Sequence, residues 1–193
     1  MYRSLAVTST SPEDTRILGA ALAPVLLPGD VISLSGDLGA GKTVLVQGLA
    51  AALSVKGRVT SPTFTIVHEY HGRYRILHID VYRLNSFQEV LDLGFEELLD
   101  PEAIMLVEWG EAVAPLLPQK YLEIDIRRSV DPNAVSHRDM VFRPRGEDWV
   151  RKLEDMRKAA EPLLNAASDG APGAERFTYA ATRMARDHRG WPA

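Results

Sequence analysis

Cysteine is absent from this 193-residue sequence. Its absence excludes disulfides, zinc sites built from cysteine and thiol catalysis, and it fits a reducing compartment. Long apolar runs are missing as well, because no stretch approaches the roughly 18 apolar residues that a membrane-spanning helix needs. We therefore expect a soluble, cytoplasmic protein that has no membrane partner.

Clusters of basic residues interleaved with aromatic ones are also lacking. The formal net charge is −4, the part of the chain before residue 150 is acidic, and only the segment after it is weakly basic. Proteins that bind nucleic acid through its phosphate backbone need a basic surface. We therefore expect any link to nucleic acid to be indirect and to run through a partner protein.

The hydrophobic and charged fractions, 46% and 25%, are typical of a globular protein. The apolar patterns predict strands over 2–8, 30–35, 65–70, 73–80, 103–107, 121–127 and 137–142, and helices over 12–23, 44–53, 86–92 and 95–99. The apolar run at 103–107 is typical of a strand buried on both faces, whereas 121–127 and 137–142 alternate like strands at a sheet edge. The expected fold is α/β, a mixed sheet with central parallel strands flanked by antiparallel strands.

The sequence changes character at residue 147. From there Trp149, Leu153, Met156 and Leu163 recur at helical spacing, residues 167–174 are typical of a flexible linker, and 177–186 form a second helical pattern. We expect a main domain over 1–146 and a helical extension over 147–193. The extension either packs on the main domain or on a partner, marks the linker of a shortened fusion, or has no role of its own.

One motif is more informative than any other feature. A complete G-x-x-x-x-G-K-[ST] loop lies between a predicted strand and a predicted helix, which is the context that such a phosphate-binding loop (P-loop) requires. The main chain of the loop and the positive end of the helix dipole would bind phosphate groups. Within it the lysine would reach the β- and γ-phosphates and the threonine hydroxyl would ligate Mg²⁺. The loop residues are Gly36, Asp37, Leu38, Gly39, Ala40, Gly41, Lys42 and Thr43.

Acidic residues follow two of the predicted strands. Asp80 ends one strand and Glu108 ends the next buried one. A P-loop protein needs an acid in this position to hold Mg²⁺ or its water shell. We favour Glu108 as the metal ligand and Asp80 as a group that organises water or the metal's surroundings, although the sequence does not divide these roles.

A segment rich in hydroxyl groups, Thr60 to Phe64, lies about one helix beyond the loop. P-loop proteins place a segment that senses the γ-phosphate at this point, and Thr63 is our candidate contact within it. The sequence contains no Asn-Lys-x-Asp motif for reading guanine, so adenine is the expected base and ATP the expected nucleotide.

Four motifs together resemble one family, the bacterial TsaE (YjeE) ATPases of tRNA threonylcarbamoyladenosine biosynthesis. They are the loop at 36–43, Ser61-Pro62-Thr63-Phe64, His78-Ile79-Asp80-Val81-Tyr82-Arg83 and Val107-Glu108-Trp109. The resemblance spans residues 2–145, and the order and spacing of the motifs are more specific than the loop alone.

The resemblance implies a P-loop ATPase that works with the protein subunits TsaD and TsaB, in which TsaD transfers the threonylcarbamoyl group to adenosine 37 of tRNA. The ATP cycle would reset the complex between turnovers, and contact with tRNA would be only indirect. Carried over by position, Thr43 and Glu108 match the Mg²⁺ ligands, while Lys42, Asp80 and Glu108 match the residues needed for activity. Further nucleotide contacts carried over by the resemblance are Trp109, Ser11 and Arg138.

Two alternatives remain open at this stage. The same loop, together with the arginines that follow residue 121, is compatible with a small-molecule kinase. The second alternative is a nucleotide-dependent scaffold that needs ATP binding but not hydrolysis. We expect the hydrolysis to be weak without partners, because a lone P-loop domain often lacks a supplied arginine or an ordered switch segment.

Overall fold

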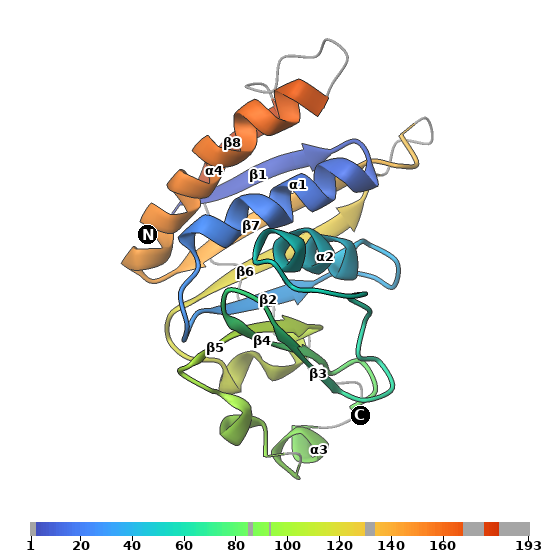
Figure 1. Cartoon of the computed structure of the whole chain (residues 1–193), viewed down its shortest axis with the longest axis vertical. Helices are drawn as coiled ribbons and strands as arrows, with labels where there is room; N and C mark the ends of the chain where they lie inside the picture. The colour runs from blue at the N-terminus through green and yellow to red at the C-terminus, as the bar shows by residue number, and fades with distance from the viewer. Residues whose placement is uncertain (1–2, 85–86, 93, 130–133, 168–175, 182–193) are drawn as a thin grey trace.

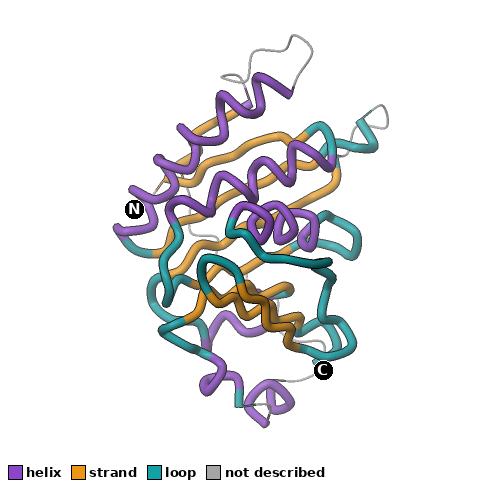
Figure 2. Tube along the Cα trace, viewed as in Figure 1, coloured by secondary structure: helices purple, strands orange, loops and turns teal. Residues whose placement is uncertain are grey.

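The computed structural model describes residues 3–84, 87–92, 94–129, 134–167 and 176–181. Within these ranges the chain forms one sheet of eight strands, in the order β3-β4-β5-β2-β6-β7-β1-β8, with helices packed on it (Figures 1 and 2). The strands are β1 Arg3–Ser9, β2 Val31–Ser35, β3 Val67–His71, β4 Arg75–Asp80, β5 Ala103–Glu108, β6 Tyr121–Arg128, β7 Arg138–Arg145 and β8 Phe177–Ala181. The α-helices are α1 Pro12–Leu22, α2 Lys42–Ala52, α3 Phe87–Asp92 and α4 Glu147–Ala167, and the 3₁₀ helices are η1 Ala23–Val25, η2 Phe95–Leu98 and η3 Gly110–Leu116.

The centre of the sheet is parallel, as the sequence predicts. Strands β4, β5, β2 and β6 pair in parallel, β3 flanks them antiparallel on one side, and β7, β1 and β8 continue antiparallel on the other. All six residues of β5 are buried, because helices or loops cover both of its faces. The predicted hairpin is also present, as β3 and β4.

The prediction that the strands near 121–127 and 137–142 lie at a sheet edge is wrong. β6 lies between β2 and β7, and β7 lies between β6 and β1. Their alternation has another cause, which is that the helices of the described ranges cover one face of this half of the sheet and not the other. Ile124 packs in the core under these helices, whereas Glu123 on the opposite face forms ion pairs with Arg143 and Arg145 at 3.0 and 2.7 Å.

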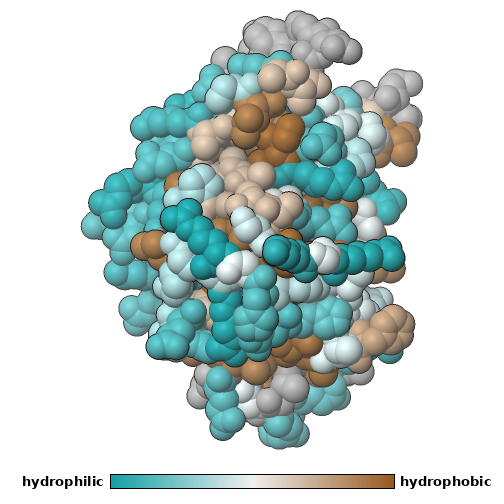
Figure 3. All heavy atoms as spheres, in the orientation of Figure 1, coloured by the Kyte–Doolittle hydropathy of each residue, from teal (hydrophilic) through white to brown (hydrophobic). Residues whose placement is uncertain are grey.

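Two apolar layers enclose the sheet. Helices α1, α2 and α4 pack on one face around buried residues such as Leu18, Leu49 and Phe142, while α3, η2 and η3 cover β4 and β5 on the other. Helices α1 and α2 approach closely, since a Cβ added to Gly48 would stand 2.0 Å from the carbonyl oxygen of Arg16. In Figure 3 the helical face is mostly hydrophilic, with a band of apolar residues over the upper helices and smaller apolar patches at the sides and the lower end.

The C-terminal part confirms one prediction and corrects two. The predicted helix after residue 147 is α4, which buries Trp149, Leu153 and Met156 against the main core, but Leu164 rather than Leu163 continues this buried stripe. The second predicted helix is wrong over 177–181, where the chain forms β8 and pairs with β1. Without β8 this edge of β1 would present unpaired backbone N–H and C=O groups among the described residues, and pairing with 177–181 satisfies them. The predicted linker from 168 onward and the residues from 182 onward lie outside the described residues.

The division at residue 146 remains a prediction. Across the described ranges, no helix combines the length and the apolar character that crossing a membrane requires.

Candidate functional site

The site lies where the central parallel strands end. β2, β5 and β4 are neighbours, so their carboxyl ends meet at one edge of the sheet. The pairing places Asp80 of β4 opposite Glu108 of β5, and Leu34 of β2 beside Glu108. The acids that are distant in sequence are therefore brought next to the glycine loop that follows β2.

The loop can follow its path only with glycine at particular positions. Gly36 has a φ of 130°, and a Cβ there would stand 2.1 Å from the carbonyl oxygen of Ile126. Gly41, with a φ of 116°, is the residue before α2 and has no side chain to cap the helix. The first backbone N–H groups of α2 are consequently directed at the cavity without a capping side chain, which is the arrangement that binds anions.

Lys42 is buried within the loop that it belongs to. Its Nζ donates hydrogen bonds to the main-chain carbonyls of Gly36 and Asp37, at 2.5 and 3.1 Å. Burial lowers the pKa of Lys42, while the charges of nearby carboxylates, first among them that of Glu108, oppose this shift. The ammonium group also lies 3.8 Å from the centroid of the Trp109 ring, a favourable contact between a cation and an aromatic face.

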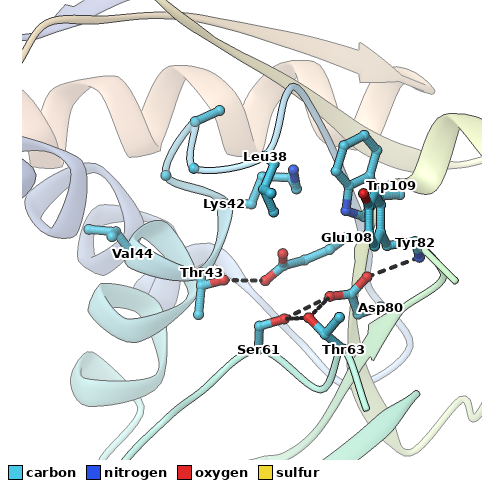
Figure 4. Close-up of a pocket in the computed structure, with 13 residues that line it drawn as sticks. Leu38, Lys42, Thr43, Val44, Ser61, Thr63, Asp80, Tyr82, Glu108 and Trp109 are labelled. Carbon is cyan, nitrogen blue, oxygen red and sulfur yellow. Dashed lines mark hydrogen bonds between the residues drawn. The ribbon is translucent and has the colours of Figure 1, made fainter. Parts of the chain in front are cut away.

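The two carboxylates are held by different groups. Glu108 Oε1 accepts a hydrogen bond of 2.8 Å from the Thr43 hydroxyl and lies 2.9 Å from Nε2 of His78. Asp80 Oδ2 accepts from the hydroxyls of Ser61 and Thr63, at 2.7 and 2.8 Å (Figure 4). Both carboxylates are almost fully buried, with 3% of each residue exposed.

Aromatic side chains form the remaining wall. The rings of Tyr82 and Trp109 are stacked at a tilt, with centroids 4.8 Å apart. Trp109 has a φ of 62°, a left-handed conformation that is uncommon for a residue other than glycine and that costs backbone strain. The main-chain N–H of Trp109 donates a hydrogen bond to the carbonyl oxygen of Leu34 at 2.8 Å, so β2 holds the turn in this conformation.

These groups line one cavity, which Figure 4 shows from the side of the carboxylates. Its lining consists of Leu38 to Val44 together with Ser61, Thr63, Asp80, Tyr82, Glu108 and Trp109. The atoms that could ligate a metal here are the hydroxyl oxygen of Thr43 and the carboxylate oxygens of Asp80 and Glu108. Mg²⁺ prefers oxygen ligands of these kinds, so this set fits a magnesium ion. A nucleotide phosphate chain would find main-chain N–H groups and one ammonium group here.

Most of the predicted site residues meet at this cavity. Gly39, Ala40, Gly41 and Leu38 line it, as do the lysine, threonines, acids and tryptophan already described, whereas Gly36 and Asp37 shape the loop behind it. Two residues carried over by resemblance are not in the lining, and their predicted contacts with nucleotide stay predictions. Ser11 caps α1, its hydroxyl accepting from the N–H of Asp14 at 3.1 Å, and Arg138 donates to the carbonyl of Ala40 at 2.9 Å.

The sequence reasoning did not propose Tyr82 and His78 as site residues, and among the hydroxyls of the segment Thr60 to Phe64 it singled out Thr63 rather than Ser61. A signal was present for His78, because it stands two residues before Asp80 and side chains two apart share a face of a strand. Tyr82 belongs to the same motif and follows directly after the strand ends. Ser61 lies two residues from Thr63, and their hydroxyls are 2.6 Å apart.

A strand, a glycine loop and a helix, with acids at the ends of the neighbouring parallel strands, define the P-loop class of α/β proteins. The profile of one family, described as "Threonylcarbamoyl adenosine biosynthesis protein TsaE", matches residues 9–138. The chain belongs to this TsaE family.

Individual relatives support the same assignment. The chain is 42% identical over 125 residues to a tRNA threonylcarbamoyladenosine biosynthesis protein TsaE of Treponema pallidum, covering 65% of this chain and 93% of that protein. It is 38% identical over 149 residues to the protein of that name from Bacillus subtilis, covering 77% and 90%. A crystal structure of Bacillus subtilis YdiB superposes with a TM-score of 0.70 and 33% identity, over 82% of this chain and 97% of that one.

Proposed function

We propose that this protein is a magnesium-dependent ATPase that supports turnover of the complex making threonylcarbamoyladenosine at position 37 of tRNA, together with TsaD and TsaB subunits. The observation that supports this most strongly is the meeting of the glycine loop, Lys42 and the acids of β4 and β5 at one cavity. The family's place in tRNA threonylcarbamoyladenosine biosynthesis supplies the biological setting.

In this proposal each residue has a definite task. Lys42 would exchange its bonds to main-chain carbonyls for bonds to the β- and γ-phosphates, while the N–H groups at the start of α2 bind the same anion. Thr43 and Glu108 would hold Mg²⁺, which neutralises the phosphate charge when it is bound. The Thr43 hydroxyl already donates its proton to Glu108, so its oxygen lone pairs remain for a metal.

Asp80 would couple the cavity to the segment that precedes β3. Its carboxylate accepts from Ser61 and Thr63 and from the N–H of Tyr82, at 2.7, 2.8 and 3.0 Å. A shift of these hydroxyls toward a γ-phosphate would therefore change the surroundings of Asp80 as well. The tilted rings of Tyr82 and Trp109 would exclude water from one side of the phosphate chain.

The test is phosphate release from Mg-ATP by the purified chain, alone and with its cognate TsaD and TsaB, using Lys42→Ala as the blank. We expect slow release alone and strong stimulation by the subunits, lost in the variant. Release that the subunits do not change would refute the partner-dependent ATPase. Multiple turnovers of tRNA modification with a non-hydrolysable ATP analogue would instead favour the scaffold, and a phosphorylated small molecule would favour the kinase.

A further inference from the structure

His78 is a buried ionisable residue for which the proposed function has no task. It lies in β4, flanked along the strand by Leu77 and Ile79, and none of its surface is exposed. Its Nε2 is 2.9 Å from Glu108 Oε1, while its Nδ1 is buried without a hydrogen-bond partner among the described residues. His78 does not line the cavity, so it would not touch a bound nucleotide or metal itself.

The hydrogen bond determines which nitrogen carries the proton. An ionised carboxylate can only accept, so the bond to Glu108 exists only when Nε2 is protonated. Nδ1 has no hydrogen-bond partner among the described residues, and a buried acceptor without a partner is tolerated better than a buried N–H donor without one. The geometry therefore favours the ring tautomer in which Nε2 carries the proton and donates to Oε1 of Glu108.

Two hydrogen bonds, from His78 and from Thr43, fix the carboxylate of Glu108. The Thr43 hydroxyl, from the first turn of α2, donates to the same Oε1 at 2.8 Å. One donor comes from β4 and the other from α2, so rotation of the carboxylate would break at least one of the two bonds. Thr43 is itself a proposed metal ligand, so His78 is the one of these two donors that would fix Oε1 without touching the metal.

We propose that His78 is a positioning residue that orients Glu108 for metal binding, which rests on the proposed function of Glu108 as a Mg²⁺ ligand. Groups that orient metal ligands through a hydrogen bond commonly change metal affinity roughly 10- to 100-fold when they are removed. A purely structural histidine, packing beside Tyr70 of the neighbouring strand β3, would affect stability but not the response to metal. The rings of His78 and Tyr70 are 6.3 Å apart at their centroids, so this packing exists alongside the hydrogen bond.

The experiment measures ADP binding by calorimetry, first in EDTA and then over a series of Mg²⁺ concentrations. His78→Phe keeps a ring but loses the donor, His78→Gln keeps an N–H donor near the position of Nε2, and His71→Phe is the matched control. His71 is at the exposed end of β3, with 76% of its side chain accessible. Mg²⁺ should increase the affinity for ADP, and we expect His78→Phe to raise the Mg²⁺ concentration that gives half of this increase at least about tenfold. The affinity for ADP in EDTA should be unchanged. We expect His78→Gln to recover most of this loss and His71→Phe to match the wild type.

Several results would overturn the proposal, and they are distinguishable from failure of the proposed function. A His78→Phe protein with a wild-type response to Mg²⁺ refutes it, as does a His78→Gln protein that loses as much as His78→Phe. A wild-type protein whose ADP affinity ignores Mg²⁺ refutes the metal site itself, and this proposal with it.

A second measurement does not depend on metal or on the stability of a variant. In the wild-type protein without metal, ¹⁵N chemical shifts of the His78 ring should identify Nε2 as protonated and Nδ1 as unprotonated. The opposite tautomer would exclude the hydrogen bond to Glu108 and so refute the positioning role.

Discussion

The cavity at the ends of β2, β4 and β5 and the C-terminal arm, made of α4, Arg176 and β8, both bury polar side chains, but they satisfy them differently. In the arm, opposite charges meet. Lys152 of α4 lies 2.5 Å from Asp30, and Arg176 lies 2.9 Å from the buried Asp14. In the cavity, Lys42 donates to main-chain carbonyls instead, at 2.5 and 3.1 Å.

The carboxylates of the cavity follow the same pattern as its lysine. Asp80 and Glu108 accept hydrogen bonds mainly from hydroxyl groups. The difference teaches where ligand binding is possible. Charges that are paired with each other are already satisfied, whereas buried charges held by neutral groups keep most of their electrostatic attraction for an ion of opposite sign. This difference supports the proposal that the cavity receives phosphate and a cation, whereas the paired charges of the arm hold the fold together.

The comparison is tested most severely by exchanging one lysine from each region for alanine. We expect Lys42→Ala to reduce phosphate release from ATP by at least roughly 100-fold, because it removes the charge directed at the transferred phosphate. Lys152→Ala, which breaks the ion pair with Asp30 and the contact with the Trp149 ring, should leave release within about twofold of the wild type. Comparable losses in the two variants, measured at saturating Mg-ATP, would contradict the distinction between the regions.

Truncation in the arm should act on stability alone. Met156 is fully buried between α4 and the main core, so Met156→Ala should lower the free energy of unfolding by about 2–5 kcal/mol. Urea denaturation measures this, and calorimetry should find the ADP affinity unchanged at a temperature where the variant is folded. Leu163→Ala is the control on the same helix, with about half of its side chain exposed, and should cost less than about 1 kcal/mol.

Asp80→Asn sharpens the comparison from the side of the cavity. The amide keeps the shape of the side chain but removes its charge, so the hydrogen bonds from Ser61 and Thr63 weaken. We expect phosphate release to fall roughly 10- to 100-fold, with ADP affinity in EDTA nearly unchanged. A loss of nucleotide affinity as large as the loss of rate would show that Asp80 acts in binding instead.

The ion pair between Arg176 and Asp14 connects the arm to the start of α1. Burial raises the pKa of Asp14, but the hydrogen bonds from Thr10 and the charge of Arg176 outweigh it and lower the pKa below its ordinary value. Arg176→Ala leaves Asp14 buried with fewer partners and should cost about 1–3 kcal/mol of unfolding free energy. Arg151→Ala, whose side chain is 77% exposed on α4, is the matched control in the same urea experiment. Equal stability of the two variants would mean that β8 does not hold α1.

The smallest expected effect is the pH dependence of the arm. Hydrogen bonds from Arg157 and Tyr179 lower the pKa of Glu154 to about 2 from its ordinary value of 4.5. The pKa of Glu154 is lower in the folded than in the unfolded state. Its ionised carboxylate therefore stabilises the fold fully above about pH 4.5, and this stabilisation is lost as the pH falls toward 2. The side chain is 37% exposed, so solvent screening keeps the effect small. Urea denaturation should find that the difference in the free energy of unfolding between the wild type and Glu154→Gln is smaller at pH 3 than at pH 7. An equal difference at both pH values would contradict this.

Much of the fold and site was predictable because the signals are local. The loop at 36–43 can be identified from residue type and spacing alone, and the apolar run at 103–107 before Glu108 predicts the central strand that the structure has as β5. The predictions that failed concern partners that are distant in sequence. The alternation of β6 suggests a sheet edge, although β6 lies inside the sheet. Residues 177–181 form a strand because they pair with an edge of β1 that would otherwise lack a partner among the described residues.

The sequence by itself determined the phosphate-binding loop, the parallel centre of the sheet and the acids at the ends of its strands, since each depends on residue type and short spacing. Only the tertiary structure decided which groups hold those acids. His78 faces Glu108 because β4 and β5 pair in one register, and Thr43 reaches the same oxygen because α2 begins beside β5. The physical reason is that a hydrogen bond depends on atoms being within about 3 Å, and for residues 30 or 65 positions apart only the packing of the chain brings them there.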